Sequence, residues 1–204
     1  MTAPVLAPDD VWAWRVADYD RPLWVSPNRN AGRWNEAGSP PTQYWSTHPA
    51  AAWAEALRNS QVDSLQDLHQ QRRRLWVARL QTTGLLQVPF DAALQLGLQA
   101  EDLVDNDWTA CQAAANRLRT SGTTGIVVPS AALPGGSNVV LFGPRVAISL
   151  DLTPLDDGDL PMAAAAADAH APEAVLAVLR RHGQAHHGLL AHQHGQPQPL
   201  IDVV

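Results

Sequence analysis

Residues 44–59 read YWSTHPAAAWAEALRN, in which an aromatic run passes within a few positions into an alanine-rich one. Residues 44–46 have the composition of a short strand. Residues 49–59 predict a short helix, because alanine and leucine favour helices and either Ser46 or Thr47 can act as the N-cap. A strand that leads directly into a helix indicates a fold that contains both kinds of element.

The chain on the C-terminal side of this stretch continues the mixed pattern. Short runs of β-branched or aromatic residues, bounded by glycine and proline, predict strands over residues 75–80, 125–128, 139–142 and 146–152. A second helix is predicted over residues 108–118, preceded by Asn106 or Asp107 and closed near Gly122. Because strands and helices mix without a regular βαβ repeat, we expect an α/β (α+β) fold, a compact mixed sheet with flanking helices.

Composition and charge limit the class of protein. The chain has 204 residues, a hydrophobic fraction of 46% and no uninterrupted apolar run long enough to cross a membrane, so we expect a soluble protein. No signal-peptide pattern follows Met1, and the single cysteine, Cys111, excludes an internal disulfide, so we expect a cytoplasmic location. The net charge of -6 argues against a surface that holds nucleic acid by neutralising phosphates.

A change in composition near residue 152 predicts a boundary. All eight tryptophans lie before it, whereas the remaining residues are rich in alanine, histidine and proline. We expect a domain over residues 1–152, followed by a low-complexity linker and a C-terminal helix or tail over residues 153–204. The predicted helix runs from Pro172 to about Gly183.

This extension contains two further features. Arg180 and Arg181 follow the apolar stripe of the predicted helix and favour its C-terminal dipole. His182 and His186 are one helical turn apart, a spacing that can bind a metal. Since low-complexity tails often collect histidine without ordered structure, we expect no metal site.

Two charged side chains near the first predicted strand are candidates for a binding site. Arg33 follows a glycine, and its guanidinium can bind phosphate through two parallel hydrogen bonds, although it could also be an ordinary ion-paired arginine. On a helical wheel Glu55 lies opposite the core-facing residues Trp53 and Leu57. In a pocket it could hold ribose hydroxyls and stabilise the positive charge that develops as a glycosidic bond breaks; alternatively, it is a solvated glutamate paired with Arg58.

Other polar residues lie close to predicted strands. The ring of Tyr44 could stack on a flat ligand such as nicotinamide or belong to the core. Ser130 and Asn138 lie in a turn-rich connection that exposes hydroxyl and amide groups. No triad signature surrounds Ser130, so we do not expect it to be a nucleophile. No glycine-rich phosphate loop is present, and a nucleotide would have to be bound in another way.

Taken together, five blocks in this order resemble the RES family, which is named for an arginine, a glutamate and a serine. The blocks are Trp14-Arg15-Val16, Gly32-Arg33-Trp34-Asn35, Tyr44-x-Ser46, Ala54-Glu55-Ala56-Leu57, and Val128-Pro129-Ser130-Ala131 ahead of Asn138. The resemblance covers about residues 11–152. It implies a compact fold similar to that of ADP-ribosyltransferase toxins, with a central cleft for NAD. Where the family commonly has asparagine, proline and histidine after its last core strand, this chain reads Phe142-Gly143-Pro144-Arg145.

The resemblance also implies roles for individual residues. NAD would be the substrate, with its phosphates contacted by Arg15 and Arg33. Tyr44 would face the nicotinamide and Glu55 the nicotinamide ribose, which makes Arg33, Tyr44 and Glu55 the catalytic candidates. Ser130 would orient the ribose or the glutamate, and Asn138 completes the binding set.

The implied activity is cleavage of the nicotinamide–ribose bond by a toxin that acts as an NAD glycohydrolase or phosphorylase, depletes NAD and arrests growth. A cognate antitoxin of the Xre-like, helix-turn-helix type would block the cleft. Two alternatives stay open: a protein ADP-ribosyltransferase that modifies a cellular target, and a catalytically silent binding module. We expect neither nucleic acid nor membrane as a partner, and the sequence leaves homo-oligomer formation open.

Overall fold

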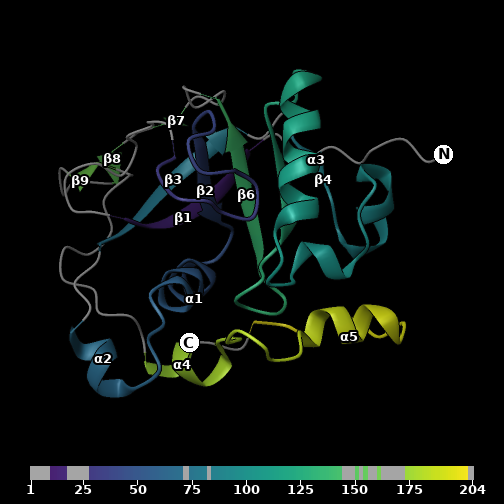
Figure 1. Cartoon of the computed structure of the whole chain (residues 1–204). Helices are drawn as coiled ribbons and strands as arrows, with labels where there is room; N and C mark the ends of the chain where they lie inside the picture. The colour runs from purple at the N-terminus through teal and green to yellow at the C-terminus, as the bar shows by residue number, and fades with distance from the viewer. Residues whose placement is uncertain are drawn as a thin grey trace.

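The centre of the molecule is a seven-stranded sheet with the strand order β4-β5-β6-β2-β1-β3-β7, covered by helices (Figure 1). The computed structural model describes residues 10–17, 28–70, 74–81, 84–143, 150–151, 154–155, 160–161 and 173–201. All neighbouring strands of this sheet are antiparallel except β4 and β5. The expected mixed sheet with flanking helices is therefore confirmed.

The strands of the sheet are β1 (Asp10–Ala17), β2 (Thr42–Ser46), β3 (Arg74–Gln81), β4 (Leu86–Gln87), β5 (Gly125–Pro129), β6 (Ser137–Phe142) and β7 (Leu150–Asp151), and a separate pair is formed by β8 (Pro154–Leu155) and β9 (Leu160–Pro161). The α-helices are α1 (Pro49–Asn59), α2 (Leu65–Gln70), α3 (Thr109–Thr120), α4 (Glu173–Val178) and α5 (His187–Gln193), and two 3₁₀ helices are η1 (Phe90–Leu96) and η2 (Glu101–Leu103).

The strand registers decide on which face of the sheet each polar side chain lies. Trp14 is paired with Ser46, and Ser46 with Asn138. Directly opposed residues in antiparallel strands point to the same face, and the Ser46 Oγ accordingly donates a hydrogen bond to Asn138 Oδ1 at 2.8 Å. Side chains alternate along a strand, so Arg15 and Trp45 lie on the opposite face.

Buried residues form clusters on both faces of the sheet. On the face that carries Ser46 and Asn138, one cluster packs α3, η1 and β5 around Trp34, and a second packs α1 against α4 around Trp53. The other face carries a smaller cluster that includes Trp45. The candidate residues on α1 therefore lie between two parts of the core.

The first two predicted helices agree with the structure in position but not in their N-caps, which are His48 and Trp108. α1 has the predicted bounds, but its N-cap is His48, whose Nδ1 accepts a hydrogen bond from Ala50 N at 3.2 Å; the prediction of Ser46 or Thr47 is wrong. α3 begins one residue later than predicted, and Asp107 Oδ1 accepts from Thr109 N at 2.9 Å.

Four of the predicted strands are confirmed as β2, β3, β5 and β6. Most of the fifth prediction, residues 146–152, lies outside the described residues, although residues 150–151 form β7. The sequence analysis missed β1, which runs along the full length of β3. Most of the predicted linker after residue 152 also lies outside the described residues.

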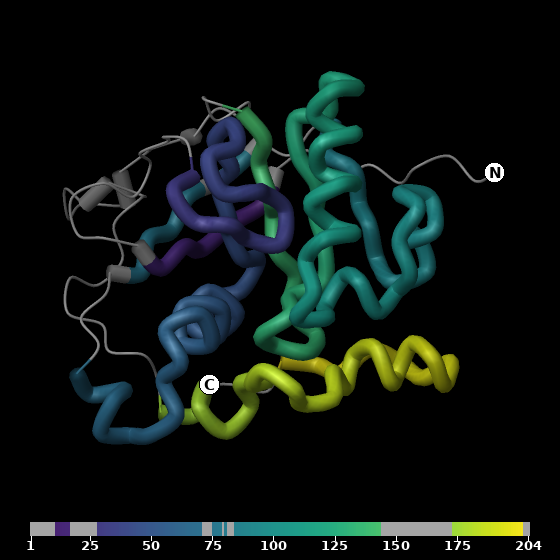
Figure 2. The backbone as a smooth tube through the Cα atoms, viewed as in Figure 1, coloured from purple at the N-terminus to yellow at the C-terminus, as the bar shows by residue number. Residues whose placement is uncertain are grey.

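The C-terminal residues 173–201, called here the C-terminal segment, pack along one side of the molecule. Figures 1 and 2 show α4 and α5 running below α1 and below the part that contains α3 and η1. Val175 and Leu179 are buried in the α1 cluster. The predicted helix is too long, because α4 ends at Val178 and Gly183 lies in a turn with a φ of 81°.

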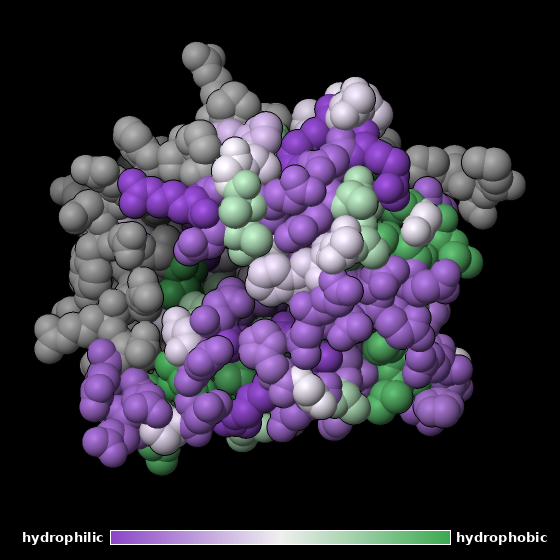
Figure 3. Space-filling view, viewed as in Figure 1, coloured by the Kyte–Doolittle hydropathy of each residue, from purple (hydrophilic) through white to green (hydrophobic). Residues whose placement is uncertain are grey.

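The surface seen in Figure 3 is mainly hydrophilic, with hydrophobic residues in separate patches. Within the described residues, no helix has both the length and the apolar composition that crossing a membrane requires.

Candidate functional site

The Glu55 carboxylate is held by donors from a different part of the chain. It projects from α1, and its Oε1 atom accepts hydrogen bonds from Ser130 Oγ at 2.8 Å, from Asn138 Nδ2 at 2.7 Å and from Ala132 N at 3.3 Å. Among the described residues, none donates to Oε2. The structure thus brings together three of the predicted site residues, and one oxygen of the carboxylate stays available.

Residues 130–136, which join β5 to β6 and are called here the Ser130 loop, supply two of these donors, Ser130 and Ala132. Ser130 Oγ also accepts hydrogen bonds from the backbone N–H groups of Ala132 and Leu133, and Ser130 N donates to Gly136 O at 2.8 Å. A Cβ at Gly136 would lie 3.2 Å from the Cβ of Ala51, so glycine allows the loop to approach α1 closely. Because its donors are neutral, the network fixes Glu55 without neutralising its charge.

The Tyr44 hydroxyl has a structural partner on each side. It donates to Asn35 Oδ1 at 2.6 Å and accepts from Trp34 N at 3.0 Å. A Cβ at Gly32 would come within 2.8 Å of this hydroxyl, which explains the glycine. Burial raises the pKa of Tyr44 above its ordinary value, so the phenol stays protonated and is not a general base.

Arg33 is tied to the segment that precedes α3. Its Nη1 donates to Asp102 O at 3.0 Å, and the Cys111 thiol donates to the same oxygen at 3.1 Å. Burial raises the pKa of Cys111 to about 11, so the thiol stays protonated near neutral pH. Cys111 is therefore part of the scaffold, and Arg33 is the partly buried charge of this group.

Arg15, which the resemblance placed at the phosphates, does not join this group. Its guanidinium lies over the ring of Trp45, 5.9 Å from the ring centroid, on the face of the sheet opposite Ser46 and Asn138. The alternation of side chains along β1 causes this separation. We therefore leave Arg15 out of the candidate site.

The sequence alternative in which a solvated Glu55 pairs with Arg58 is wrong, because these two described residues form no salt bridge. Arg58 is 6% exposed, and its Nη2 donates to Asn106 Oδ1 at 2.7 Å, while its Nε has no partner among the described residues. Burial lowers the pKa of Arg58 to about 10, an effect that Glu55 opposes and that Arg180 and Arg33 reinforce. A hydrophobic run with arginine one turn after glutamate is too common a pattern to have revealed this.

His182 and His186 do not form the helical pair that their spacing suggested. His182 lies in a turn, whereas His186 is the N-cap of α5. The His186 Nδ1 accepts from Leu189 N at 3.0 Å, so Nε2 carries the proton and donates to Ser130 O at 2.9 Å. Both ring nitrogens are used inside the protein, which leaves neither for a metal ion.

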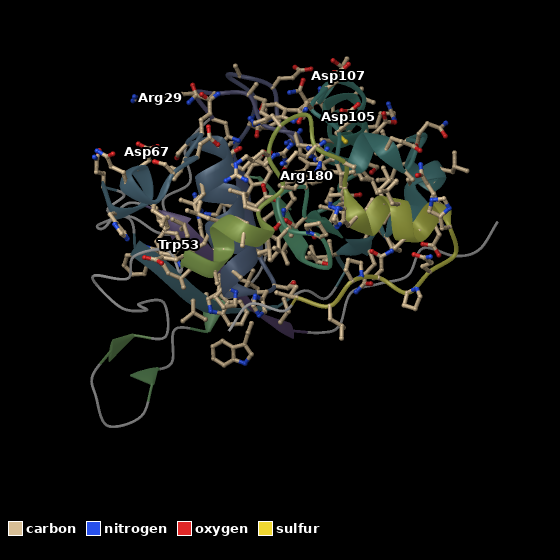
Figure 4. All side chains as sticks on the ribbon, turned by 90° about the horizontal axis from the view of Figure 1, so that it is seen from below. Arg29, Trp53, Asp67, Asp105, Asp107 and Arg180 are labelled. Carbon is tan, nitrogen blue, oxygen red and sulfur yellow. The ribbon has the colours of Figure 1, made fainter. Side chains whose placement is uncertain are left out.

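A cavity of about 340 Å³ lies beside the Ser130 loop, between η1 and α5. Its walls include Phe90, Gly136, His186 and His192. Neither Arg33 nor Glu55 lines this cavity, so it is not the common hollow that the sequence analysis expected. The C-terminal segment instead contacts the Ser130 loop, since Arg180 N, from the residue labelled in Figure 4, donates to Ala132 O at 2.8 Å.

Comparisons with known proteins agree with this architecture. A protein-family model described as the RES domain matches residues 11–163. No curated protein matches the sequence. Among solved structures, a chain in the crystal structure of the M. tuberculosis MbcT–MbcA toxin–antitoxin complex is similar, with a TM-score of 0.57 and 23% identity, over 69% of this chain and 81% of that chain. At this identity the likeness concerns the fold.

Proposed function

The chain belongs to the RES domain family, and from this premise we propose that it is an enzyme that uses NAD as its substrate and breaks the bond between nicotinamide and ribose. The observation that carries the proposal is the state of Glu55. One carboxylate oxygen is fixed by Ser130, Asn138 and Ala132, and none of the described residues donates a hydrogen bond to the other.

Such a carboxylate suits the charge that this reaction develops. When the bond breaks, nicotinamide leaves as a neutral molecule with the bonding electron pair, and the ribose becomes oxocarbenium-like. Glu55 stabilises this positive charge and accepts hydrogen bonds from ribose hydroxyls through Oε2. Attack by water releases ADP-ribose and a proton. Attack by phosphate instead gives the phosphate of ADP-ribose.

The other candidates take supporting roles. Arg33 binds the diphosphate, since a guanidinium presents paired donors to phosphate oxygens. The edge of the Tyr44 ring faces the nicotinamide while its hydroxyl anchors the loop at residues 32–35. Ser130 and Asn138 act through Glu55 by holding its orientation, and so are positioning residues.

We also propose that the enzyme arrests growth by depleting NAD and that a cognate antitoxin inhibits it. The support is family membership and the similar fold in a structure described as a toxin–antitoxin complex. Co-expression with the adjacent reading frame, expected to encode an Xre-like helix-turn-helix protein, should restore growth. If neither this protein nor loss of Glu55 relieves growth arrest, the toxin proposal fails.

The enzymatic test is the release of nicotinamide from NAD by the purified chain, in water alone, with phosphate and with cell proteins. We expect release with ADP-ribose or its phosphate as the second product. The Glu55→Gln variant should be inactive, and Glu101→Gln, which makes the same change at an exposed residue, should keep wild-type activity. Label transferred from NAD to a macromolecule would instead support an ADP-ribosyltransferase, and no release under any condition would overturn the proposal.

A further inference from the structure

Three arginines from distant parts of the chain are attached to one short segment, residues 102–106. Arg33 Nη1 donates to Asp102 O at 3.0 Å, Arg180 Nη1 to Val104 O at 2.6 Å, and Arg58 Nη2 to Asn106 Oδ1 at 2.7 Å. The acceptors are alternate residues, and a segment of this length spans at most about 14 Å even when extended. The segment that holds the three guanidinium groups is therefore comparable in length to a diphosphate with its two flanking sugars.

Within the described part of the chain, no ion pair neutralises these charges. Arg58 and Arg180 are 6% and 9% exposed, yet among the described residues no carboxylate forms a salt bridge with either, or with Arg33. The partners of Arg180 are carbonyl oxygens of Val104, Ala131 and Gln184. Burying unpaired charge costs several kcal/mol, so such an arrangement is typical of a site that binds an anion.

The pKa of Arg180 reflects the other charged groups around the three arginines. Burial lowers the pKa of Arg180, Arg33 lowers it further, and the carboxylates of Asp105 and Glu55 oppose the change. Both carboxylates act from beyond salt-bridge distance, and Glu55 Oε1 is already bound by neutral donors. The net charge of the group formed by the three arginines and Glu55 is therefore positive. A ligand that carries two negative charges would balance it.

Arg180 comes from the C-terminal segment, beyond the part of the chain that matches the RES domain. It is positioned by contacts on both sides: Leu179 is buried against α1, and Arg180 N donates to Ala132 O at 2.8 Å. His186 then donates to Ser130 O, so the segment is attached to the same loop that holds Glu55. Figure 4 shows Arg180 between Trp53 on one side and Asp105 on the other.

We propose that Arg58 and Arg180 form with Arg33 a single diphosphate-binding site, and that the C-terminal segment completes it. This inference rests on the proposed function, in which the ribose next to the diphosphate lies at Glu55. Arg33 Nη1 donates to the 102–106 segment, and its guanidinium also contacts the Cys111 thiol. Arg58 and Arg180 each use one Nη atom to donate to this segment, and among the described residues the other Nη atom of each has no hydrogen-bond partner. Those donors bind the diphosphate oxygens.

The test is the affinity of the full chain for inorganic pyrophosphate, measured by calorimetry and by the rise in Tm that the ligand causes. Arg180→Gln should weaken binding by about tenfold or more, because it removes charge-assisted hydrogen bonds. The matched control is Arg181→Gln, which removes the same charge from the next residue, an exposed partner of Asp63. This control should change the affinity by less than about twofold.

Two further variants keep the test decisive if Arg180→Gln does not fold. Arg58→Gln removes a guanidinium from α1 and should weaken pyrophosphate binding to a similar extent. Arg180→Lys keeps the positive charge but loses the paired N–H donors of the guanidinium, so it should give an intermediate affinity. Wild-type affinity in the folded Arg58→Gln or Arg180→Gln variant would overturn the inference. So would equal weakening by Arg181→Gln, or no pyrophosphate binding by the wild-type chain.

Failure of this inference can be told apart from failure of the proposed function. Nicotinamide release that persists unchanged at low NAD concentration in Arg180→Gln would leave the enzyme intact and remove Arg180 from the site. Conversely, pyrophosphate binding that depends on Arg180, in a chain that never releases nicotinamide, would keep the anion site and refute the NAD-cleaving activity.

Discussion

The carboxylate end and the guanidinium end of the candidate site are built in opposite ways. Glu55 is held by three neutral donors, so its position is fixed while its charge is kept. The arginines are held by neutral acceptors, so their charges are also kept. The described residues thus leave the charge at each end unpaired, and under the proposed function we expect chemistry at the first end and binding at the second. Kinetic variants can separate the two.

The largest effect is expected at the carboxylate end. Glu55→Gln preserves the shape of the side chain but removes the charge that stabilises the transition state, so kcat for nicotinamide release should fall about 1000-fold. KM for NAD should change by less than about threefold, because the ground state develops no such charge. A fall in kcat below about tenfold would contradict the proposed role.

The second effect belongs to the guanidinium end. Arg33→Gln should raise KM for NAD about 30-fold and leave kcat within about threefold, because it removes charge-assisted hydrogen bonds to the substrate. Arg117→Gln is the matched control, since Arg117 is exposed and donates only to Leu96 O among the described residues. A loss in kcat at constant KM would instead assign Arg33 to the chemical step.

A third prediction concerns His186, which joins the C-terminal segment to the Ser130 loop. Burial lowers its pKa from 6.5 to about 4, so the unfolded chain binds the proton more strongly than the folded one. The free energy of unfolding should therefore fall as the pH falls from about 6.5 towards 4, and be lower by about 2 kcal/mol at pH 5 than at pH 7.5. Denaturant unfolding at both pH values measures this.

The control is the same pair of measurements on His186→Gln, which removes the titrating ring but keeps a donor for Ser130 O. The variant should show a pH-dependent loss smaller by about 2 kcal/mol than that of the wild type. Equal losses in the two proteins would show that His186 does not link the segment to the loop in its neutral form.

The smallest effect is expected for Ser130→Ala. This variant removes the donor to Glu55 and the acceptor of two buried N–H groups, so stability should fall by about 1–2 kcal/mol. Since Asn138 still holds Oε1, kcat should fall only about fivefold. Ser39→Ala, at a less buried turn, should change neither value, and unchanged activity in Ser130→Ala would remove Ser130 from the set of positioning residues.

The elements that the sequence predicts best are those with a local signal. Residues 49–59 form the predicted helix because alanine and leucine favour a helix and a proline suits its first turn, whatever the rest of the chain does. The N-cap was missed, since His48 is rarely preferred over the neighbouring Ser46 and Thr47. Strand β1 was missed because Trp12 and Trp14 do not alternate clearly with polar residues over Asp10–Ala17.

In the candidate site, contacts between residues that are far apart in the sequence were harder to predict. The order of the motif blocks indicated Arg33, Glu55, Ser130 and Asn138, and the structure places the last three in one network. The position of Arg180 could not be predicted from its neighbours, because its hydrogen bond to Val104 O joins parts of the chain that are far apart in the sequence. The opposite limit applies to Arg15. The motif block indicates this residue, but the pairing of β1 with β2 places its side chain on the face of the sheet opposite Ser46.

The docking of the C-terminal segment also orders events during synthesis. Gly135 has no side chain, and a Cβ there would overlap the carbonyl oxygen of Pro199, so a glycine at this position allows the segment to approach the loop closely. A ribosome makes Glu55 and its donors first, and Arg180 only afterwards. A nascent chain therefore contains every residue of the Glu55 network before it contains the C-terminal segment that packs against the Ser130 loop.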